Sequence, residues 1–208
     1  MLSPFALTGR HARLEPLGEE HVAGLAAAAA EDRSSYAFTR VPDGIAGTRE
    51  YVGSTLAEQA AGRSLPFAVR RLSDERLVGC TRYLDMEVFG TPDGEPGDGR
   101  PPSVLEIGAT WYAASAQRTA VNTDVKLVLL TQAFEAWGAL RVTLKTDARN
   151  AGSRTAIARL GAQFEGLRRA HMPAVDGTVR DTAYYSILRA EWPGIRDALE
   201  RRLIPGSG

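Results

Sequence analysis

Apolar and polar residues alternate along several stretches of the chain, and a period of two is typical of β-strands. The alternation predicts strands at residues 10–17 and 141–147, and we also expect strands at the strand-like runs 66–71, 76–86, 103–113, 162–172 and 179–189. Only the polar segment LSDE separates the strands at 66–71 and 76–86, so we expect an antiparallel hairpin there. The Asp-Gly pair in AVDG (174–177) predicts another hairpin between the last two strands.

Apolar residues recur at helical spacing in other stretches, which we expect to be helices. These run from Glu19 to about Asp32, from Gly47 to Ala61, from Asn122 to Trp137, from Asn150 to Leu160, and over 190–203. Thr48 and Asn150 are the expected N-caps, Gly138 and Gly161 are expected to end their helices, and Pro193 suits a first helical turn. Helices and strands mix without a regular βα repetition, which predicts a mixed α+β fold.

A length of 208 residues favours a single domain over residues 1–208. Basic and acidic residues balance at 25 each, so no net field attracts nucleic acid or an anionic membrane. No apolar run approaches the ~20 residues of a membrane span, and the first residues lack the pattern of a signal peptide. We therefore expect a cytoplasmic protein without nucleic-acid or membrane partners, as a monomer or a homodimer.

The cysteine content excludes two kinds of site, and the composition of one segment predicts a loop. Cys80 is the only cysteine, which excludes an intramolecular disulfide and a thiolate metal cluster, and no histidine spacing suits a metal, so we expect none. Residues from about 88 to 102 are mostly Gly, Pro and Asp, which predicts a surface loop. A substrate lid and an insertion without function both fit that composition.

The segment AQRTAVN (116–122) stands between a predicted strand and a long predicted helix. Backbone N–H groups at a helix N-terminus hold phosphate oxygens, because they have no partner within the helix and the helix dipole favours an anion. The segment has no proline, so every residue offers an N–H, and Asn122 is a good N-cap at which the helix can begin. An ordinary strand–helix turn also fits these residues.

Four blocks, in order along the chain, carry a resemblance to a known family. They are LTGRHARLEPLGEEH (7–21), LEIGATWY (105–112), QRTAVNTDVKLVLLTQAFE (117–135), and RVTLKTDARNAGSRTAIARLGAQFEGLRRAH (141–171) followed by DGTVRDTAYYSILRAEWP (176–193). Together they resemble the GNAT N-acetyltransferases, most closely the ribosomal-protein N-terminal acetyltransferase branch (RimJ/RimL-like).

The resemblance implies a GNAT fold, with a splayed mixed central sheet of about seven strands flanked by helices, and acetyl-CoA as co-substrate where two parallel strands diverge. The backbone of Thr110, Trp111 and Tyr112 would pair with the pantetheine arm, and one of its N–H groups would polarise the thioester carbonyl. The pyrophosphate would be held by Gln117, Arg118, Thr119, Ala120, Val121, Asn122 and Thr123. The family pattern here is Gln/Arg-x-x-Gly-x-Gly/Ala, and both Ala120 and Asn122 depart from it.

Glu106 is an acidic residue among Val104, Leu105, Ile107 and Gly108, in a strand that we expect to be buried. Burying an unpaired carboxylate is costly, so the residue calls for a reason. An amine must lose its proton before it attacks a thioester, and a carboxylate can take that proton. In the family that the chain resembles, a glutamate on this strand often serves as the base. A structural carboxylate paired with an arginine or capping the backbone is the alternative.

Asn150 and Ser153 lie in DARNAGSR, at the start of a predicted helix. The resemblance implies that Asn150 bonds the pantetheine or its neighbouring backbone, and that the Ser153 hydroxyl approaches the sulfur as a proton donor. From the residues alone, an N-cap and a serine on the helix surface explain the pair as well.

These observations predict an enzyme, an N-acetyltransferase that moves an acetyl group from acetyl-CoA to a primary amine by direct transfer in a ternary complex. The amine would be a protein N-terminus, a lysine or a small molecule. Two alternatives belong to other classes: a catalytically weak acyl-CoA-binding or sensing domain, and an interaction protein without CoA. The first predicts CoA binding without turnover, and the second predicts no CoA binding.

Overall fold

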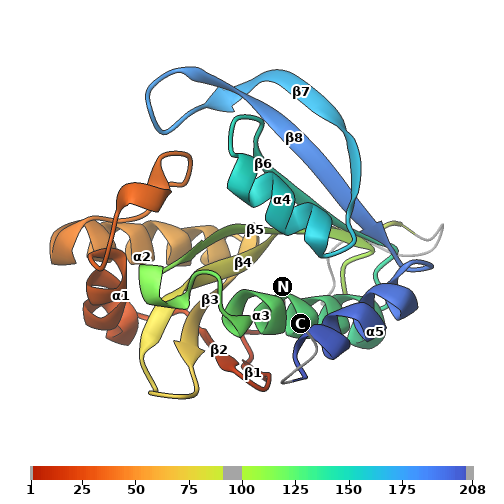
Figure 1. The fold of residues 1–208 in the computed structure, drawn as a ribbon, viewed down its shortest axis with the longest axis horizontal. Helices are drawn as coiled ribbons and strands as arrows, with labels where there is room; N and C mark the ends of the chain where they lie inside the picture. The colour runs from red at the N-terminus through yellow and green to blue at the C-terminus, as the bar shows by residue number, and fades with distance from the viewer. Residues whose placement is uncertain (1, 91–99, 205–208) are drawn as a thin grey trace.

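The computed structural model describes residues 2–90 and 100–204, so most of the expected loop at about 88–102 lies outside the described residues. One mixed sheet has the strand order β1-β2-β3-β4-β5-β6-β8-β7 (Figure 1). Its strands are β1 (Leu7–Thr8), β2 (Ala12–Pro16), β3 (Ser64–Arg71), β4 (Leu77–Glu87), β5 (Val104–Tyr112), β6 (Arg141–Asp147), β7 (Gln163–Pro173) and β8 (Val179–Leu188). Neighbours run antiparallel except β5 and β6, which are parallel.

The expected mixed α+β fold with a splayed sheet is confirmed, and the strand ends differ from expectation by only a residue or two. The sheet has eight strands instead of about seven, because the short β1 pairs with β2 through Leu7↔Leu14 and Thr8↔Arg13. A two-residue strand is too short to show an alternating pattern, so no periodic signal announces it.

The helices are α1 (Val22–Ala29), α2 (Gly44–Ala60), α3 (Ala120–Thr131), α4 (Ala151–Arg159) and α5 (Trp192–Arg202). Short 3₁₀ turns are η1 (Glu19–His21), η2 (Ser34–Tyr36) and η3 (Ala114–Ala116), and the π-helical turn η4 (Gln132–Ala136) continues α3. Successive side chains of a strand point to opposite faces. On β4, Arg82 bonds Tyr51 of α2 and Tyr83 bonds the Leu129 carbonyl of α3, so α2 and α3 cover opposite faces of the sheet.

Two expected N-caps are wrong. Thr48 is not an N-cap: α2 begins at Gly44, and the Thr48 hydroxyl donates to the Gly44 carbonyl one turn back, at 2.7 Å. Asn122 does not mark the start of α3, because Thr119 is the N-cap and its hydroxyl oxygen accepts from the Val121 N–H. Both errors have one cause: polar residues near a helix start satisfy the cap pattern whether or not they occupy the cap.

Candidate active site at the β5–β6 opening

β5 and β6 pair over only three positions, and then they separate. The pairs are Val104↔Arg141, Leu105↔Val142 and Glu106↔Thr143. Beyond them β5 stays paired with β4 as far as Tyr112, and β6 stays paired with β8 as far as Asp147. The two halves of the sheet therefore diverge after Glu106 and leave an edge of β5 without a strand partner among the described residues. We call this region the β5–β6 opening.

A bulge in β5 changes the direction of the strand inside the opening. Cys80 pairs with Trp111 but Arg82 pairs with Gly108, so β5 contains one more residue than β4 here, and Ala109 has φ +47°. The Thr110 hydroxyl consequently reaches Thr81 at 2.8 Å and accepts from Lys126 of α3 at 3.0 Å.

Other segments already use part of the β5 edge that the sequence assigned to the cofactor. The Tyr112 carbonyl accepts from the Tyr36 hydroxyl and from Gln117 Nε2, each at 2.9 Å. Trp111 and Tyr112 have buried side chains. If pantetheine pairs with this edge, the Tyr112 carbonyl is not available to it, which leaves Thr110 and Trp111 as the backbone that can pair.

The loop between β5 and α3 holds its shape without glycine. Arg118 takes the left-handed position with φ +59°, whereas Ala120 has a negative φ as the first residue of α3. Thr119 both caps Val121 and donates to the Ala116 carbonyl at 2.7 Å. The departures from the family pattern at Ala120 and Asn122 thus cause no backbone strain, since neither residue needs the conformation that favours glycine.

The first turn of α3 lies at the positive end of a helix, where an anion is stabilised. The Val121 N–H is already bonded to the Thr119 hydroxyl, so the N–H groups of Ala120, Asn122 and Thr123 are the ones left for an anion. Gln117 Nε2 donates to the Ser35 hydroxyl and to the Tyr112 carbonyl, so in this structure its side chain helps to hold the loop.

Glu106 is the buried carboxylate of the opening. It is 3% exposed, and its Oε2 lies 2.6 Å from the Lys145 ammonium of β6. That contact is an ion pair without the angles of a hydrogen bond, so Oε2 counts among the buried atoms without a hydrogen-bond partner. Burial raises the pKa of Glu106 to about 7; Lys145 opposes this rise, and Asp85 adds to it. A carboxyl group with this pKa exchanges protons at neutral pH.

Gly108 provides the space that the Glu106 carboxylate occupies. The two residues lie on the same face of β5, and a Cβ built on Gly108 would come within 2.3 Å of Glu106 Oε1. The glycine that interrupts the apolar strand is therefore part of the carboxylate's site.

Sequence reasoning missed three charged neighbours of Glu106. Lys145 bridges Glu106 and Asp85, whose Oδ2 lies 3.2 Å from the same ammonium. Lys126 is buried in α3, and burial lowers its pKa to about 7 against the opposing charge of Glu106. Lys126 is a charged residue within the apolar face of a long helix, so it could have been identified from the sequence in the same way as Glu106. Lys145 gave no such signal, because it becomes a neighbour only through the parallel pairing of β5 with β6.

Asn150 is the N-cap of α4, as expected, and its Oδ1 accepts from the Ser153 N–H at 2.9 Å. This bond fixes the first turn of α4 three residues after β6 ends, on the β6 side of the opening. Ser153 is partly buried there. Both residues therefore lie at the start of α4, directly after β6.

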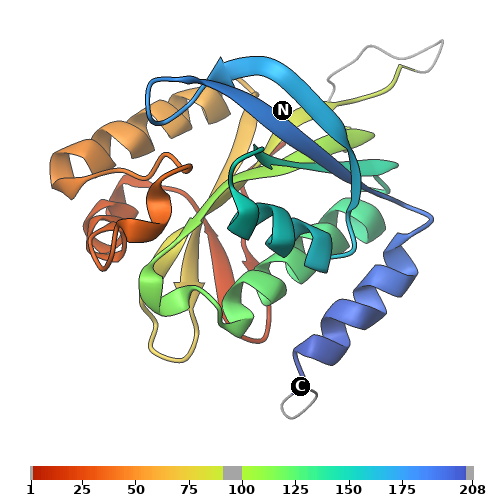
Figure 2. The same ribbon diagram turned by 45° about the horizontal axis from the view of Figure 1, so that its top comes forward.

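Three segments meet at Arg149, beside that turn. Its guanidinium bonds Asp147 at the end of β6 and Asp176 in the β7–β8 turn, each at 2.8 Å, and stacks over the ring of Phe38 in the α1–α2 connection at 5.2 Å. Figures 1 and 2 show the β7–β8 hairpin (blue) extending back toward the α1–α2 side. Arg149 therefore links the hairpin, β6 and the α1–α2 connection around one end of the opening.

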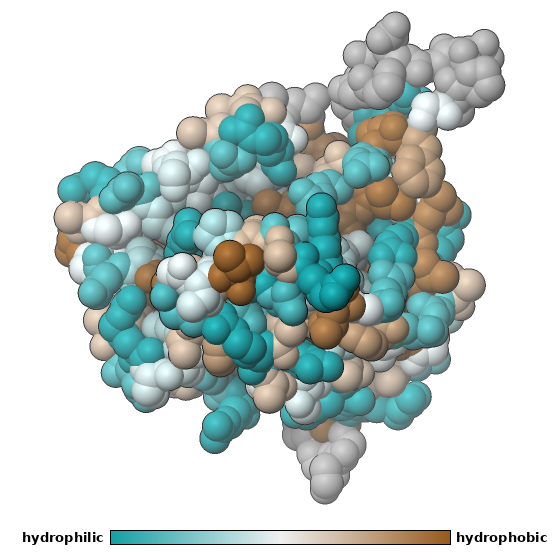
Figure 3. Space-filling view, turned by 90° about the horizontal axis from the view of Figure 1, so that it is seen from above, coloured by the Kyte–Doolittle hydropathy of each residue, from teal (hydrophilic) through white to brown (hydrophobic). Residues whose placement is uncertain are grey.

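The β7–β8 hairpin exposes several large apolar side chains. Phe164, Leu167, Val175 and Val179 are each about half exposed or more. Figure 3, which looks onto this side, shows brown apolar surface in separate patches between teal polar ones. The hairpin is thus a mixed surface next to the opening and not one continuous apolar face.

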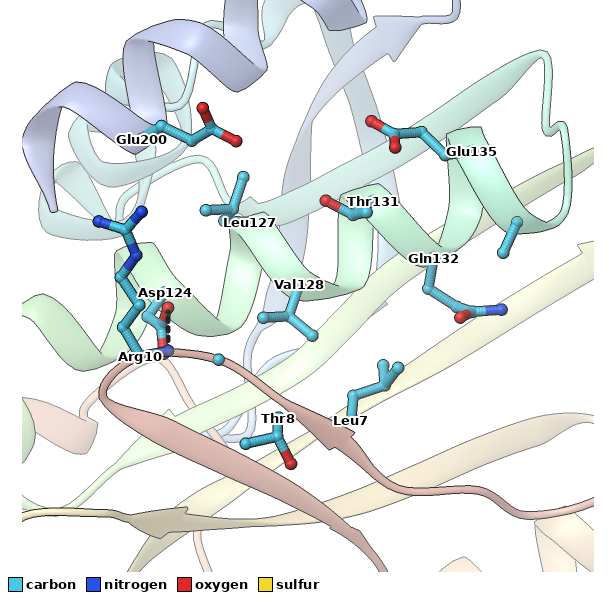
Figure 4. Close-up of a pocket in the computed structure, with 12 residues that line it drawn as sticks. Leu7, Thr8, Arg10, Asp124, Leu127, Val128, Thr131, Gln132, Glu135 and Glu200 are labelled. Carbon is cyan, nitrogen blue, oxygen red and sulfur yellow. Dashed lines mark hydrogen bonds between the residues drawn. The ribbon is translucent and has the colours of Figure 1, made fainter.

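A cavity of about 800 Å³ lies elsewhere, between β1, α3 and α5 (Figure 4). Its lining includes Leu7, Leu127 and Val128, and none of the residues that the sequence assigned to the site. The one buried carboxylate that lines it, Asp124, is fully used: it accepts the backbone N–H groups of Arg10, His11 and Ala12 at 2.8–3.1 Å. Its chemistry gives no reason to place a reaction there.

A family model for the acetyltransferase (GNAT) domain matches residues 11–163, well over half of the chain. The chain belongs to the GNAT acetyltransferase family. It is accordingly an N-acetyltransferase, and enzymes of this family use acetyl-CoA.

Solved structures share the fold over nearly the whole chain. A GCN5-related N-acetyltransferase from Brucella melitensis has a TM-score of 0.82 at 25% identity, covering 98% of this chain and 87% of its own. A protein from T. thermophilus assigned as an acetyltransferase has a TM-score of 0.77 at 30% identity, covering 98% and 100%. Mycobacterium smegmatis RimJ in complex with CoA-disulfide has a TM-score of 0.75 at 20% identity, covering 96% and 95%. No curated protein matches the chain.

The described residues contain no group of three or more His, Cys, Asp or Glu side chains that would hold a metal ion. Within the same part of the chain, no helix is both long and apolar enough to cross a membrane.

Proposed function

We propose that this GNAT enzyme transfers the acetyl group of acetyl-CoA directly to a primary amine, with Glu106 as the general base. The observation that carries the proposal is the buried Glu106 carboxylate at the β5–β6 opening, with a pKa raised to about 7. A base with a pKa near the working pH combines a useful ionised fraction with enough strength to take a proton.

The residues around the opening fit acetyl-CoA. The backbone of Thr110 and Trp111 would hold the pantetheine arm, and the N–H groups of Ala120, Asn122 and Thr123 in the first turn of α3 would hold the pyrophosphate. Asn150 and Ser153 would face the arm from the β6 side. The co-substrate supplies an activated acetyl thioester; the protein binds it and moves protons.

In this mechanism an acceptor ammonium enters from the side of α2 and gives its proton to Glu106, directly or through water. A backbone N–H of the β5 edge stabilises the oxyanion that forms on the attacked carbonyl. Ser153 donates a proton to the departing sulfur. Lys145 keeps Glu106 ionised for part of the time at neutral pH, because its charge opposes the effect of burial.

Direct transfer agrees with the state of the cysteine. Cys80 is buried in β4, and burial raises the pKa of its thiol to about 12, so it is not activated as a nucleophile. Transfer through a covalent enzyme intermediate would need another activated group, and the opening presents none among the described residues.

The acceptor that we propose is a protein amine, at an N-terminus or on a lysine. The support is the fold likeness to RimJ and, at 15% identity, to a ribosomal-protein-S5-alanine acetyltransferase from Vibrio fischeri. A small amine is the alternative, since acceptor specificity changes readily on a shared fold.

Calorimetric titration of the purified protein with acetyl-CoA and with CoA tests the first step, and release of CoA thiol with a panel of peptides and small amines tests the second. We expect saturable binding of both ligands and turnover with at least one amine. Binding without turnover on any amine would favour an acyl-CoA-binding or sensing domain. Absence of binding by a folded sample would favour an interaction protein.

A further inference from the structure

The chain has only two lysines in 208 residues, Lys126 and Lys145, and both lie at the β5–β6 opening. Arginine supplies the remaining basic residues. For an enzyme that acetylates amines, the side-chain amines of the described chain are thus confined to the neighbourhood of its own candidate base.

Lys145 places a side-chain amine beside the candidate base. Its Nζ is 2.6 Å from Glu106 Oε2, an ion-pair contact. It comes from β6 two residues beyond the last β5–β6 pair, so it lies at the point where the strands separate. The side chain is 18% exposed and bridges only Glu106 and Asp85 among the described residues, and a thioester held by the β5 edge would lie on the same opening.

Lys126 provides an internal contrast. It comes from α3, on the opposite face of the sheet, and its ammonium donates to the Thr110 hydroxyl at 3.0 Å without an ion-pair partner among the described residues. Burial lowers the pKa of Lys126 to about 7, so it needs no base to lose a proton; it differs from Lys145 in being buried, at 5% exposed, on the α3 face of the sheet.

We propose that Lys145 is a self-acetylation site, modified within the same molecule with Glu106 as base. This inference rests on the proposed function, because it uses the same acetyl donor and the same opening. Lys145 is then an acceptor that competes with external amines for the thioester.

The step balances without any further reactant. The Lys145 ammonium gives one proton to Glu106; the neutral Nζ forms a bond to the acetyl carbon while the carbon–sulfur bond breaks. The second Nζ proton passes to the thiolate, giving CoA thiol, and Glu106 later releases its proton to water. The product is a neutral amide at Lys145, which leaves the Glu106 carboxylate without its cation.

The geometry can be tested without any co-substrate. Labelling the protein with [ε-¹³C]lysine gives two side-chain signals, one for each lysine. We expect the Lys145 signal to titrate above the ordinary lysine range, because Glu106 and Asp85 raise its pKa, and to move toward lower pH in Glu106→Gln. The second of the two signals belongs to Lys126. Equal Lys145 titrations in the two proteins would overturn the contact on which the inference depends.

Modification is then followed by mass spectrometry of peptides after incubation with acetyl-CoA, with no external amine. We expect acetyl-Lys145 and unmodified Lys126, at a rate per molecule independent of protein concentration. Glu106→Gln should slow the reaction by about 10²–10⁴-fold, the usual contribution of a positioned base. Lys145→Arg should bind acetyl-CoA but take up no acetyl group in this peptide, and a good external amine should slow labelling of the wild type.

The outcomes separate this inference from the proposed function. Acetyl-CoA binding and turnover of an external amine, with Lys145 unmodified, would overturn self-acetylation and leave the proposed function standing. Equal labelling of Lys126 and Lys145, labelling that survives Glu106→Gln, or a rate per molecule that rises with protein concentration would also overturn it. Absence of acetyl-CoA binding would remove both.

Discussion

Two of the buried carboxylates among the described residues, Asp124 and Glu106, look alike by exposure and differ in their contacts. Asp124 is 1% exposed and Glu106 is 3% exposed. Asp124 accepts the backbone N–H groups of Arg10, His11 and Ala12, so its charge is matched by fixed donors. Figure 4 shows the bond from Arg10. Among the described residues, no backbone N–H donates to Glu106; it faces a lysine ammonium on one side and the separated strands on the other.

The difference shows that the partners of a buried charge, more than its burial, indicate its role. Backbone donors cannot move or give up their protons, so a carboxylate that they hold is structural. An ammonium can be replaced by another ammonium, so a carboxylate paired with one can also receive a substrate amine. Substitutions at Glu106 and at Asp124 test this distinction.

The largest expected effect is on catalysis. Glu106→Gln should lower turnover by about 10²–10⁴-fold, because the amide cannot take the acceptor's proton. Asp124→Asn should leave turnover within about twofold at a temperature where it is folded, since Asp124 lies on the other flank of α3. CoA thiol release with one amine substrate measures both. Similar losses in the two variants would contradict the division of roles.

The second effect is on stability, where we expect Asp124 to matter more than Glu106. Asp124→Ala should lower the free energy of unfolding by about 3 kcal/mol or more, because it leaves three N–H groups without their acceptor. Asp197→Ala, on the exposed side of α5, is the matched control and should change stability by less than about 0.5 kcal/mol. Urea denaturation followed by circular dichroism gives both values; a small loss at Asp124 would show that water replaces the carboxylate easily.

The third effect is the pH dependence of stability. The folded pKa of Glu106 is raised to about 7 from an ordinary 4.5, so the folded state keeps a proton that the unfolded state releases. The protonated carboxyl therefore favours folding fully at low pH, and this contribution is lost as pH rises from about 4.5 through about 7.

Between pH 5 and 7 the wild type should lose on the order of 2 kcal/mol relative to Glu106→Gln. Lys126 and Lys145 titrate at or above the top of this window, so they contribute little to the difference. Denaturation of both proteins at matched pH values gives the slope, and parallel curves would mean that Glu106 has an ordinary pKa.

The smallest effect is a displacement of the pH–rate profile. Because the base works when deprotonated, the rate should rise with pH through the pKa of Glu106. Lys145→Met removes the charge that lowers this pKa, so the midpoint of kcat/KM should move to higher pH by about 1 unit or more. Lys145→Arg keeps a positive charge and should move it less. A midpoint that stays fixed in Lys145→Met would separate Lys145 from the base.

Much of the architecture follows from local pattern, and the site follows only in part. The strand at 141–147, the Asn150 cap and the unusual charge at Glu106 are all signals carried by neighbouring residues. The pairing of Glu106 with Lys145, the cradle at Gly108 and the bulge at Ala109 depend on which strands become neighbours and in which register. That information is not local, and so the charged partners of Glu106 were missed.

The loop between β5 and α3 shows that the sequence can also mislead in the opposite direction. The absence of glycine at 120 and 122 suggests a loop that binds phosphate poorly. In the structure, however, Arg118 is the residue in the left-handed conformation that favours glycine. A sequence motif records the residue types that usually satisfy a backbone geometry, whereas the geometry itself can be shifted along the chain by a residue or two.

The scarcity of lysine also limits how readily reactive acyl donors in the surroundings modify this protein. A guanidinium stays protonated at any physiological pH and is a poor nucleophile, so an exterior whose cations are arginines gives a thioester almost nothing to attack. The arginines that supply most of the chain's 25 basic residues, against 25 acidic ones, are therefore also chemically inert toward acyl donors. Amine-directed reagents such as succinimidyl esters should, for the same reason, label this protein far more sparsely than its charge suggests.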